Sequence, residues 1–105
     1  MQRGDVYSLR LPKGSGHEQQ GKRFGVVVQS DAFLPRSVVL VAPTSRSARP
    51  ATFRPEIEIE GTRTRVLVEQ VGALDVNRLG VLSGHLTPEE LWGVDGALLT
   101  VFGLD

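Results

Sequence analysis

The chain contains no cysteine, which excludes a disulfide framework, a thiolate metal site and a cysteine nucleophile. Long apolar runs are missing as well, because the longest is a stretch such as Val38 to Pro43 and a bilayer span needs roughly 20 residues. The polar start Met1-Gln2-Arg3 lacks the apolar region of a signal peptide. We therefore expect a soluble protein of the reducing cytoplasm that does not contact membranes.

Repeats, low-complexity tracts and linkers are also absent from the 105 residues. A hydrophobic content of 40% is enough for one compact core, and the length excludes two domains. We therefore predict a single domain spanning residues 1–105. A domain this small gains stability from a partner subunit.

The net charge is zero, yet the charges are unevenly distributed along the sequence. Residues 1–55 carry nine Lys or Arg against three acids, whereas residues 56–105 carry three Arg against nine acids. Such asymmetry indicates a basic face that can meet phosphates. A mixed, solvated surface is the alternative, because a barrel mixes the two halves of its chain in space.

The first two-thirds of the chain is typical of short strands separated by glycine and proline. The expected strands are Asp5–Leu11, Phe24–Gln29, Val38–Ala42, Phe53–Ile59 and Arg65–Val71. This regular spacing favours a small β-barrel. The strict alternation over residues 56–60 predicts one buried and one wet face, and its three acids would repel phosphates.

The C-terminal part has helical character. Thr87-Pro88-Glu89-Glu90 combines a candidate N-cap, a proline at the first helical position and an acid at the third, which predicts a helix to about Phe102. Apolar residues cover more than half of its circumference, although one contact face needs only about 100°. The surplus predicts a helix that packs on its own barrel and on a second subunit. A helix packed deeply within a monomer is the alternative.

Taken together, several segments resemble the MazF/PemK toxins. They are Arg3 to Tyr7, Gly16 to Arg23, Val38 to Ser45, Glu69 to Val71, Leu74 to Gly80, and Leu82-Ser83 followed by Thr87 to Leu91. The resemblance covers nearly the whole chain in the right order. It implies a mainly β fold with a C-terminal α-helix, namely a small SH3-like β-barrel of the CcdB/MazF/PemK type that forms a homodimer.

The same resemblance implies the toxin of a type II toxin-antitoxin system. Such a toxin is a sequence-specific, metal-independent endoribonuclease, or mRNA interferase, that cuts single-stranded RNA and leaves 2′,3′-cyclic phosphate and 5′-hydroxyl ends. The implied partners are the RNA, an acidic and partly disordered cognate antitoxin, and a second copy of the chain. No cofactor is expected, and the spacing of His17 and His85 gives no metal signal.

Cleavage without a metal needs groups that hold the phosphate, neutralise developing charge and move two protons. Arg23 suits the charge role, because its guanidinium is always protonated and offers a planar fork of donors. The family pattern Glu-Gln-x-Gly-x-Arg, matched by Glu18, Gln19, Gly21 and Arg23, makes it the catalytic arginine. An ordinary surface arginine ahead of a strand is the alternative.

The resemblance also maps Thr44 onto the threonine that works beside that arginine. Its hydroxyl, or that of Ser45, could donate to a phosphoryl oxygen or orient the nucleophile. Without the resemblance, residues 43–45 are typical of a strand-ending turn. Glu18 is either the proton acceptor or the ion-pair partner of Arg23, and the sequence leaves both roles open.

Further candidates surround these residues. His17 replaces the more usual serine, and is either the acid for the leaving 5′-oxygen or an exposed loop residue. Phe24 replaces the usual proline, and either stacks an unpaired base or enters the core. Gln70 is expected to hydrogen-bond the catalytic loop from a strand. The remaining candidates for RNA contact are Lys22, Gln29, Arg46, Arg49 and Phe53.

Two other classes of function remain open. A CcdB-like toxin uses the same barrel to bind DNA gyrase without catalysis, so Arg23 would be dispensable and the C-terminal helix would dominate. A generic SH3-like interaction module would need an aromatic ligand groove. The six aromatic residues are scattered along the chain and do not indicate one.

Overall fold

The structure is a computed structural model that describes residues 1–10 and 23–105. These residues form seven strands, three short 3₁₀ helices and one α-helix. The strands are β1 (Asp5–Leu9), β2 (Phe24–Val27), β3 (Val38–Ser45), β4 (Glu56–Ile59), β5 (Thr62–Val66), β6 (Gly72–Asp75) and β7 (Leu79–His85). The helices are η2 (Asp31–Phe33), η3 (Val68–Gln70), η4 (Val76–Arg78) and α1 (Pro88–Val101).

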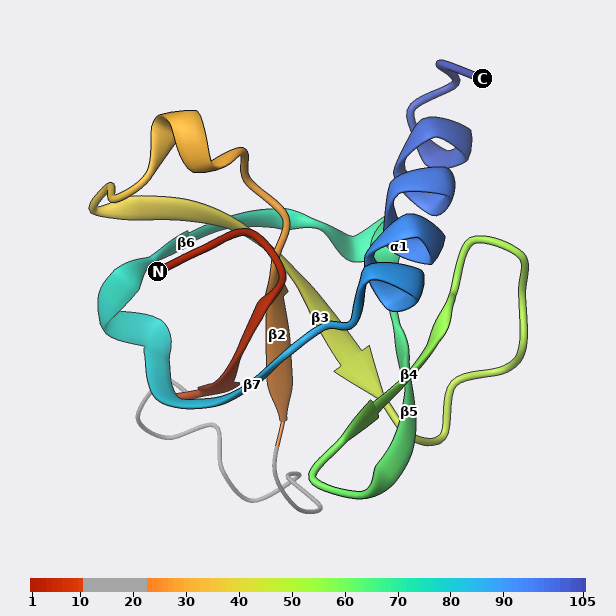
Figure 1. Cartoon of the computed structure of the whole chain (residues 1–105), viewed down its shortest axis with the longest axis horizontal. Helices are drawn as coiled ribbons and strands as arrows, with labels where there is room; N and C mark the ends of the chain where they lie inside the picture. The colour runs from red at the N-terminus through yellow and green to blue at the C-terminus, as the bar shows by residue number, and fades with distance from the viewer. Residues whose placement is uncertain (11–22) are drawn as a thin grey trace.

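All strand pairings are antiparallel and join the strands into one sheet in the order β4-β5-β3-β2-β1-β7 (Figure 1). The long strand β3 organises this sheet. One of its sides pairs first with β6 and then with β5, while its other side pairs with β2. A mainly β, SH3-like fold with a C-terminal helix is the predicted class, which is therefore confirmed.

Strand alternation divides the apolar side chains between the two faces of the sheet. Val26 and Val28 belong to one cluster, on which Val94 and Ala97 of α1 pack. Val27 lies between them in sequence and belongs to a second cluster with Val39 and Val41. The sheet therefore has a core on each face, and these cores fix the height and register of β2 and β3.

Helix α1 begins with the predicted capping box. Thr87 Oγ1 accepts from the Glu90 N–H at 3.1 Å, and Glu90 Oε1 accepts from the Thr87 N–H at 2.9 Å. The helix is capped at Phe102, as predicted. Trp92 and Phe102 stay 67% and 59% exposed, so this chain alone does not cover the wide apolar surface of the helix. Within the described ranges, no helix is long and apolar enough to cross a membrane.

Several predicted strand limits are wrong. Pro43 does not end β3, because its carbonyl accepts the Leu67 N–H at 2.8 Å and the ladder continues to Ser45. The expected strand over residues 65–71 turns into η3 after Val66, since a 3₁₀ turn closes between the Gln70 N–H and the Leu67 carbonyl. The expected strand over residues 53–59 begins only at Glu56, and β1 ends at Leu9.

Strands β6 and β7 were not predicted. Both are rich in small residues, and β7 holds two glycines, which read as turn signals in the sequence. His85 ends β7. Its Nδ1 lies 2.8 Å from Oδ1 of the buried Asp5 at the start of β1.

Candidate functional site

The strand end where β2 begins and β3 finishes lies at the bottom of Figure 1 and carries the predicted catalytic pair. Arg23 directly precedes β2, and its carbonyl accepts the Leu9 N–H at 2.9 Å. Thr44 lies on β3, and its Oγ1 donates to the Phe24 carbonyl at 3.3 Å. The hydroxyl of Thr44 is thus bonded to the residue next to Arg23, which places Thr44 beside the start of β2.

Thr44 and Ser45 differ in how their hydroxyls are placed. Thr44 is 3% exposed and sits opposite Val66 of β5, so the alternative that it lies in a turn is wrong. Ser45 is half-buried and stands opposite Arg65, with its Oγ 3.4 Å from that of Ser47. Thr44 therefore anchors the start of β2, while the Ser45 hydroxyl lies closer to solvent.

A close strand contact depends on Gly25. A Cβ added to this residue would lie 2.4 Å from Cγ1 of Val41 and 3.0 Å from Cδ2 of Leu9. A side chain at position 25 would therefore displace these neighbours. Glycine thus allows β2 to pack where the Thr44 hydroxyl reaches the Phe24 carbonyl.

Three arginines meet at this end of the sheet. The Arg10 N–H donates to the Arg78 carbonyl at 2.7 Å, and Nε of Arg78 donates back to the Arg10 carbonyl at 2.9 Å. Arg10 follows Leu9, whose N–H is bonded to Arg23, so the main chains of all three arginines are joined. Arg10 was not among the predicted site residues, and the β1–β2 register is the signal that brings it there.

The segment between β3 and β4 carries the other predicted basic residues. Arg46 and Arg49 are exposed, whereas Phe53 is half-buried and packs against the cluster beneath α1. Arg54 follows, with its Nη2 2.6 Å from Glu69 Oε2. This bond lowers the pKa of the Glu69 carboxyl, although burial acts in the opposite direction.

Three further candidates are placed differently from one another. Phe24 is half-buried, and its ring packs against the same cluster. Gln29 lies at the opposite end of β2 from Arg23, where its amide donates to the Phe33 carbonyl and accepts from the Leu40 N–H. Gln70 is exposed on η3, so its expected place on a strand is wrong. His17, Glu18 and Lys22 lie outside the described residues.

Two acidic positions outside the strand end have defined roles. Asp75 Oδ1 accepts from the Asn77 N–H at 2.8 Å and so caps the turn of η4. Asp5 accepts from His85 and from the Gln2 N–H. Burial and the negative charge of Asp5 raise the pKa of the Tyr7 phenol. Neither arrangement points to metal binding, and no cluster of metal-ligating side chains occurs within residues 1–10 and 23–105.

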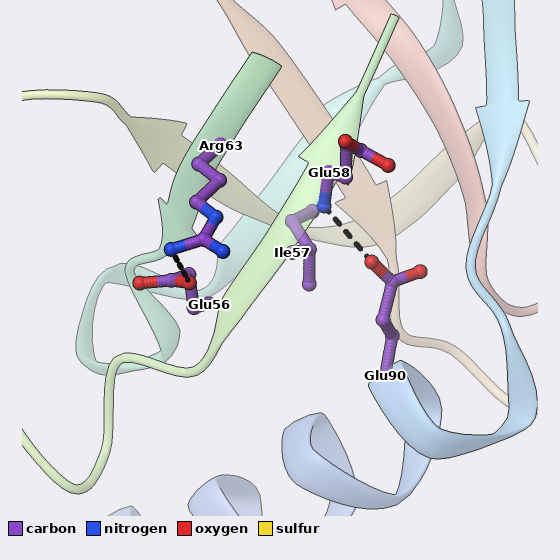
Figure 2. Close-up of a pocket in the computed structure, with 5 residues that line it drawn as sticks. All are labelled: Glu56, Ile57, Glu58, Arg63 and Glu90. Atoms are coloured by element: carbon purple, nitrogen blue, oxygen red, sulfur yellow. Dashed lines mark hydrogen bonds and ion pairs between the residues drawn. The ribbon is translucent and has the colours of Figure 1, made fainter. Parts of the chain in front are cut away.

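A pocket of ≈ 240 Å³ lies beside β4 (Figure 2). It is lined by Glu56, Ile57, Glu58, Arg63 and Glu90. Oε2 of Glu90 accepts the Glu58 N–H at 2.9 Å and joins α1 to the strand, while Arg63 pairs with Glu56 at 3.4 Å. Three carboxylates against one guanidinium repel phosphate, so the pocket does not compete with the arginine-rich strand end as an RNA site.

Comparison with known proteins agrees with this fold. The family model described as PemK-like, MazF-like toxin of type II toxin-antitoxin system matches residues 2–102. A curated relative, the putative toxin Rv3098A of Mycobacterium tuberculosis (strain ATCC 25618 / H37Rv), is 41% identical over 104 residues, which are 97% of each chain.

Solved structures share the architecture at lower identity. An endoribonuclease in complex with its cognate antitoxin from a mycobacterial species aligns with a TM-score of 0.82 and 20% identity, covering 100% of this chain and 97% of that one. Toxin MazF-mt6 of Mycobacterium tuberculosis aligns with a TM-score of 0.79 and 18% identity, covering 96% of this chain and 98% of that one. MazF of Deinococcus radiodurans aligns with a TM-score of 0.76 and 23% identity, covering 98% of this chain and 96% of that one.

Proposed function

The chain belongs to the PemK-like, MazF-like toxins of type II toxin-antitoxin systems, and we propose that it is a sequence-specific, metal-independent endoribonuclease acting on single-stranded RNA. One observation carries the proposal: the Thr44 hydroxyl is bonded to the Phe24 carbonyl, which places Thr44 beside Arg23 at an arginine-rich end of the sheet. The mycobacterial and Deinococcus structures named as endoribonuclease or MazF support it through a shared fold.

The proposed reaction is an internal phosphoryl transfer. The 2′-hydroxyl oxygen attacks the adjacent phosphorus, its proton passes to a base, and the bond to the 5′-oxygen breaks as that oxygen receives a proton. The products are a 2′,3′-cyclic phosphate and a 5′-hydroxyl. Arg23 neutralises the charge that grows on the phosphoryl oxygens. Glu18 is the proposed base, and His17 the proposed acid.

The two hydroxyls on β3 take different parts in this proposal. The Thr44 hydroxyl is buried and donates to the Phe24 carbonyl at 3.3 Å. The proposed role of Thr44 is to hold the start of β2, and with it Arg23, in register beside the scissile phosphate. Ser45 is less buried and donates to a phosphoryl oxygen. Removing the Thr44 hydroxyl should therefore misplace Arg23, and Thr44→Val tests this because it keeps the shape of the side chain.

The remaining candidates are proposed as RNA contacts. Arg46 and Arg49 are exposed beside the strand end and suit the phosphate backbone, as does Lys22. Arg10 is added to them because its N–H donates to the Arg78 carbonyl and the preceding residue, Leu9, donates to the Arg23 carbonyl. Phe24, Phe53, Gln29 and Gln70 are proposed base contacts, although the structure also gives the first three a packing or bridging role.

A homodimer is proposed from the exposed outer side of α1. Trp92, Leu99 and Phe102 are 67%, 45% and 59% exposed, although apolar side chains of this size are usually covered. The chain contains one tryptophan, so its emission reports directly on this surface. We expect a shift to shorter wavelength as the protein concentration rises through the dimer Kd. Emission that is independent of concentration, with a monomer mass by light scattering, would contradict the dimer.

The proposed setting is the cytoplasm, where a cognate antitoxin restrains the enzyme. A mycobacterial structure with this fold is an endoribonuclease in complex with its cognate antitoxin, which supports the proposal. An acidic, partly disordered antitoxin segment would compete with RNA for the arginines at the strand end. The antitoxin should therefore protect RNA from cleavage in proportion to its occupancy.

The decisive test maps the ends of a long, mixed-sequence single-stranded RNA after incubation in excess EDTA. We expect discrete cuts with 5′-hydroxyl ends, lost in Arg23→Ala and retained in Arg36→Ala. Arg36 is a matched control, because it is an exposed arginine near the opposite end of β3 and bonds only to the nearby Phe33 carbonyl among the described contacts. Intact RNA with wild-type protein would instead favour a non-catalytic toxin that binds DNA gyrase.

A further inference from the structure

The guanidinium of Arg54 contacts three parts of the chain. Its Nε and Nη2 donate to Oε2 of Glu69 at 2.9 and 2.6 Å, and its Nη1 donates to the Arg49 carbonyl at 3.2 Å. The same group lies over the Phe53 ring, 5.6 Å from its centroid. One side chain therefore joins η3 to both ends of the segment 49–53, which we call the recognition segment.

The main chain of Arg54 is fixed as well. Its N–H donates to the Ala51 carbonyl at 3.0 Å, and its carbonyl accepts from Nη1 of Arg65 at 3.0 Å. Arg65 stands opposite Ser45 in the β3–β5 ladder. Arg54 is thus held at a set position relative to the end of β3, so the contacts of its side chain place the recognition segment relative to Thr44 and Ser45.

The pairing of Arg54 with Glu69 is stronger than an ordinary surface ion pair. The two side chains are 24% and 26% exposed, and two nitrogens share one carboxylate oxygen. The other oxygen, Oε1, is buried and has no hydrogen-bond partner within the described part of the chain. Arg54 therefore compensates the partly buried negative charge of Glu69, and the Arg54 guanidinium is directed away from solvent.

We propose that Arg54 is a positioning residue for RNA recognition. It holds Arg49 and Phe53 in a single arrangement beside the end of β3, where a phosphate and an unstacked base on one side of the cleaved bond can be bound together. The inference rests on the proposed endoribonuclease function. Because Arg54 acts through these neighbours and not on the scissile phosphate, it should govern substrate binding and choice of cleavage position more than the rate of the bound complex.

The test compares Arg54→Gln with Arg63→Gln. Both remove one guanidinium, but Arg63 is 82% exposed and its ion pair with Glu56 does not reach the recognition segment. For Arg54→Gln we expect KM to rise about tenfold with kcat changed by less than about threefold, together with cuts at positions that the wild type leaves intact. The KM of Arg54→Lys should lie between those of the wild type and Arg54→Gln, because a lysine ammonium is a point charge and cannot make three directed contacts. Arg63→Gln should match the wild type.

Hydrogen exchange gives a second readout that does not need activity. The N–H of residue 54, which donates to the Ala51 carbonyl of this segment, should exchange faster in Arg54→Gln than in the wild type, with unchanged exchange in β1 and β2. Wild-type KM and unchanged cleavage positions, or unchanged exchange of the residue 54 amide, would overturn the inference while leaving the endoribonuclease intact. If wild-type protein leaves RNA uncut, the proposed function fails and takes this inference with it. Should Arg54→Gln not fold, Arg54→Lys decides by the same criteria.

Discussion

Replacing Gly25 with alanine tests the close packing that places Thr44 beside Arg23. The added methyl group would lie 2.4 Å from Cγ1 of Val41, about 1 Å short of ordinary contact. Val41 is 2% exposed in the second core cluster, so it cannot swing into solvent. Overpacking of this kind costs about 1–3 kcal/mol of unfolding free energy.

The assay is urea unfolding followed by Trp92 fluorescence, with a thermal scan beside it. A loss of 1–3 kcal/mol corresponds to a fall in Tm of about 4–8 °C for each kcal/mol in a domain of this size. Gly84→Ala is the control, since Gly84 also lies in a strand of the sheet and a Cβ there meets nothing within 4 Å. We expect that variant to stay within about 0.5 kcal/mol of the wild type.

A second substitution identifies the cause. Val41→Ala alone should cost about 2 kcal/mol, because it removes buried methyl groups. Combined with Gly25→Ala it also removes the clashing atom, so the double variant should be more stable than the sum of the two losses predicts. Strictly additive losses, or a Gly25→Ala protein as stable as Gly84→Ala, would show that the close approach of Gly25 to Val41 does not limit the packing of β2.

Three further predictions concern single groups. Glu90→Ala should lower the unfolding free energy by about 1–2 kcal/mol by chemical denaturation, because Glu90 accepts both the Thr87 and the Glu58 N–H; Glu89→Ala, in the same helical turn, should cost much less. The bond to Arg54 lowers the pKa of Glu69 in the folded protein, so the wild type should be more stable than Glu69→Gln at neutral pH. This difference in unfolding free energy should shrink as pH falls from 4.5 through the folded pKa, and a constant difference would contradict the pairing with Arg54. Tyr7, the one tyrosine, has a pKa raised above 10.0, so its absorbance titration should lie at higher pH than that of the unfolded chain, and the stability it adds is lost as pH rises through the folded pKa.

The helix and the fold class could be predicted because their signals are local and agree with one another. Thr87, Pro88 and Glu90 occupy successive capping positions, and each acts as its position dictates. The apolar excess of α1 likewise predicted the exposure of Trp92 and Phe102. The strand limits could not be predicted as well, because pairing partners decide them: Pro43 stays in β3 through its bond to Leu67, a residue far along the chain.

The candidate site was predicted only in part, because strand pairing brings some of its residues together. The motif around Arg23 and the residues at the end of Val38–Ser45 are sequence signals, but their adjacency follows from the β2–β3 pairing. Arg10 and Arg54 carry no motif and were missed, because their placement depends on the main-chain bonds to Arg78 and on the contacts with Glu69 and Arg49. The RNA sequence that is cleaved depends on such contacts and cannot be predicted from residue types.

RNA should bind and be cut at the end of the sheet that carries Arg23 and Thr44. The most direct test is NMR titration with an oligonucleotide of the cleaved sequence whose attacking 2′-hydroxyl is replaced by hydrogen, so that it binds without reacting. We expect amide shifts to concentrate at Arg23, Thr44, Ser45 and Arg46. Shifts confined to the acidic pocket at Glu58 and Glu90, or spread along α1 alone, would contradict it.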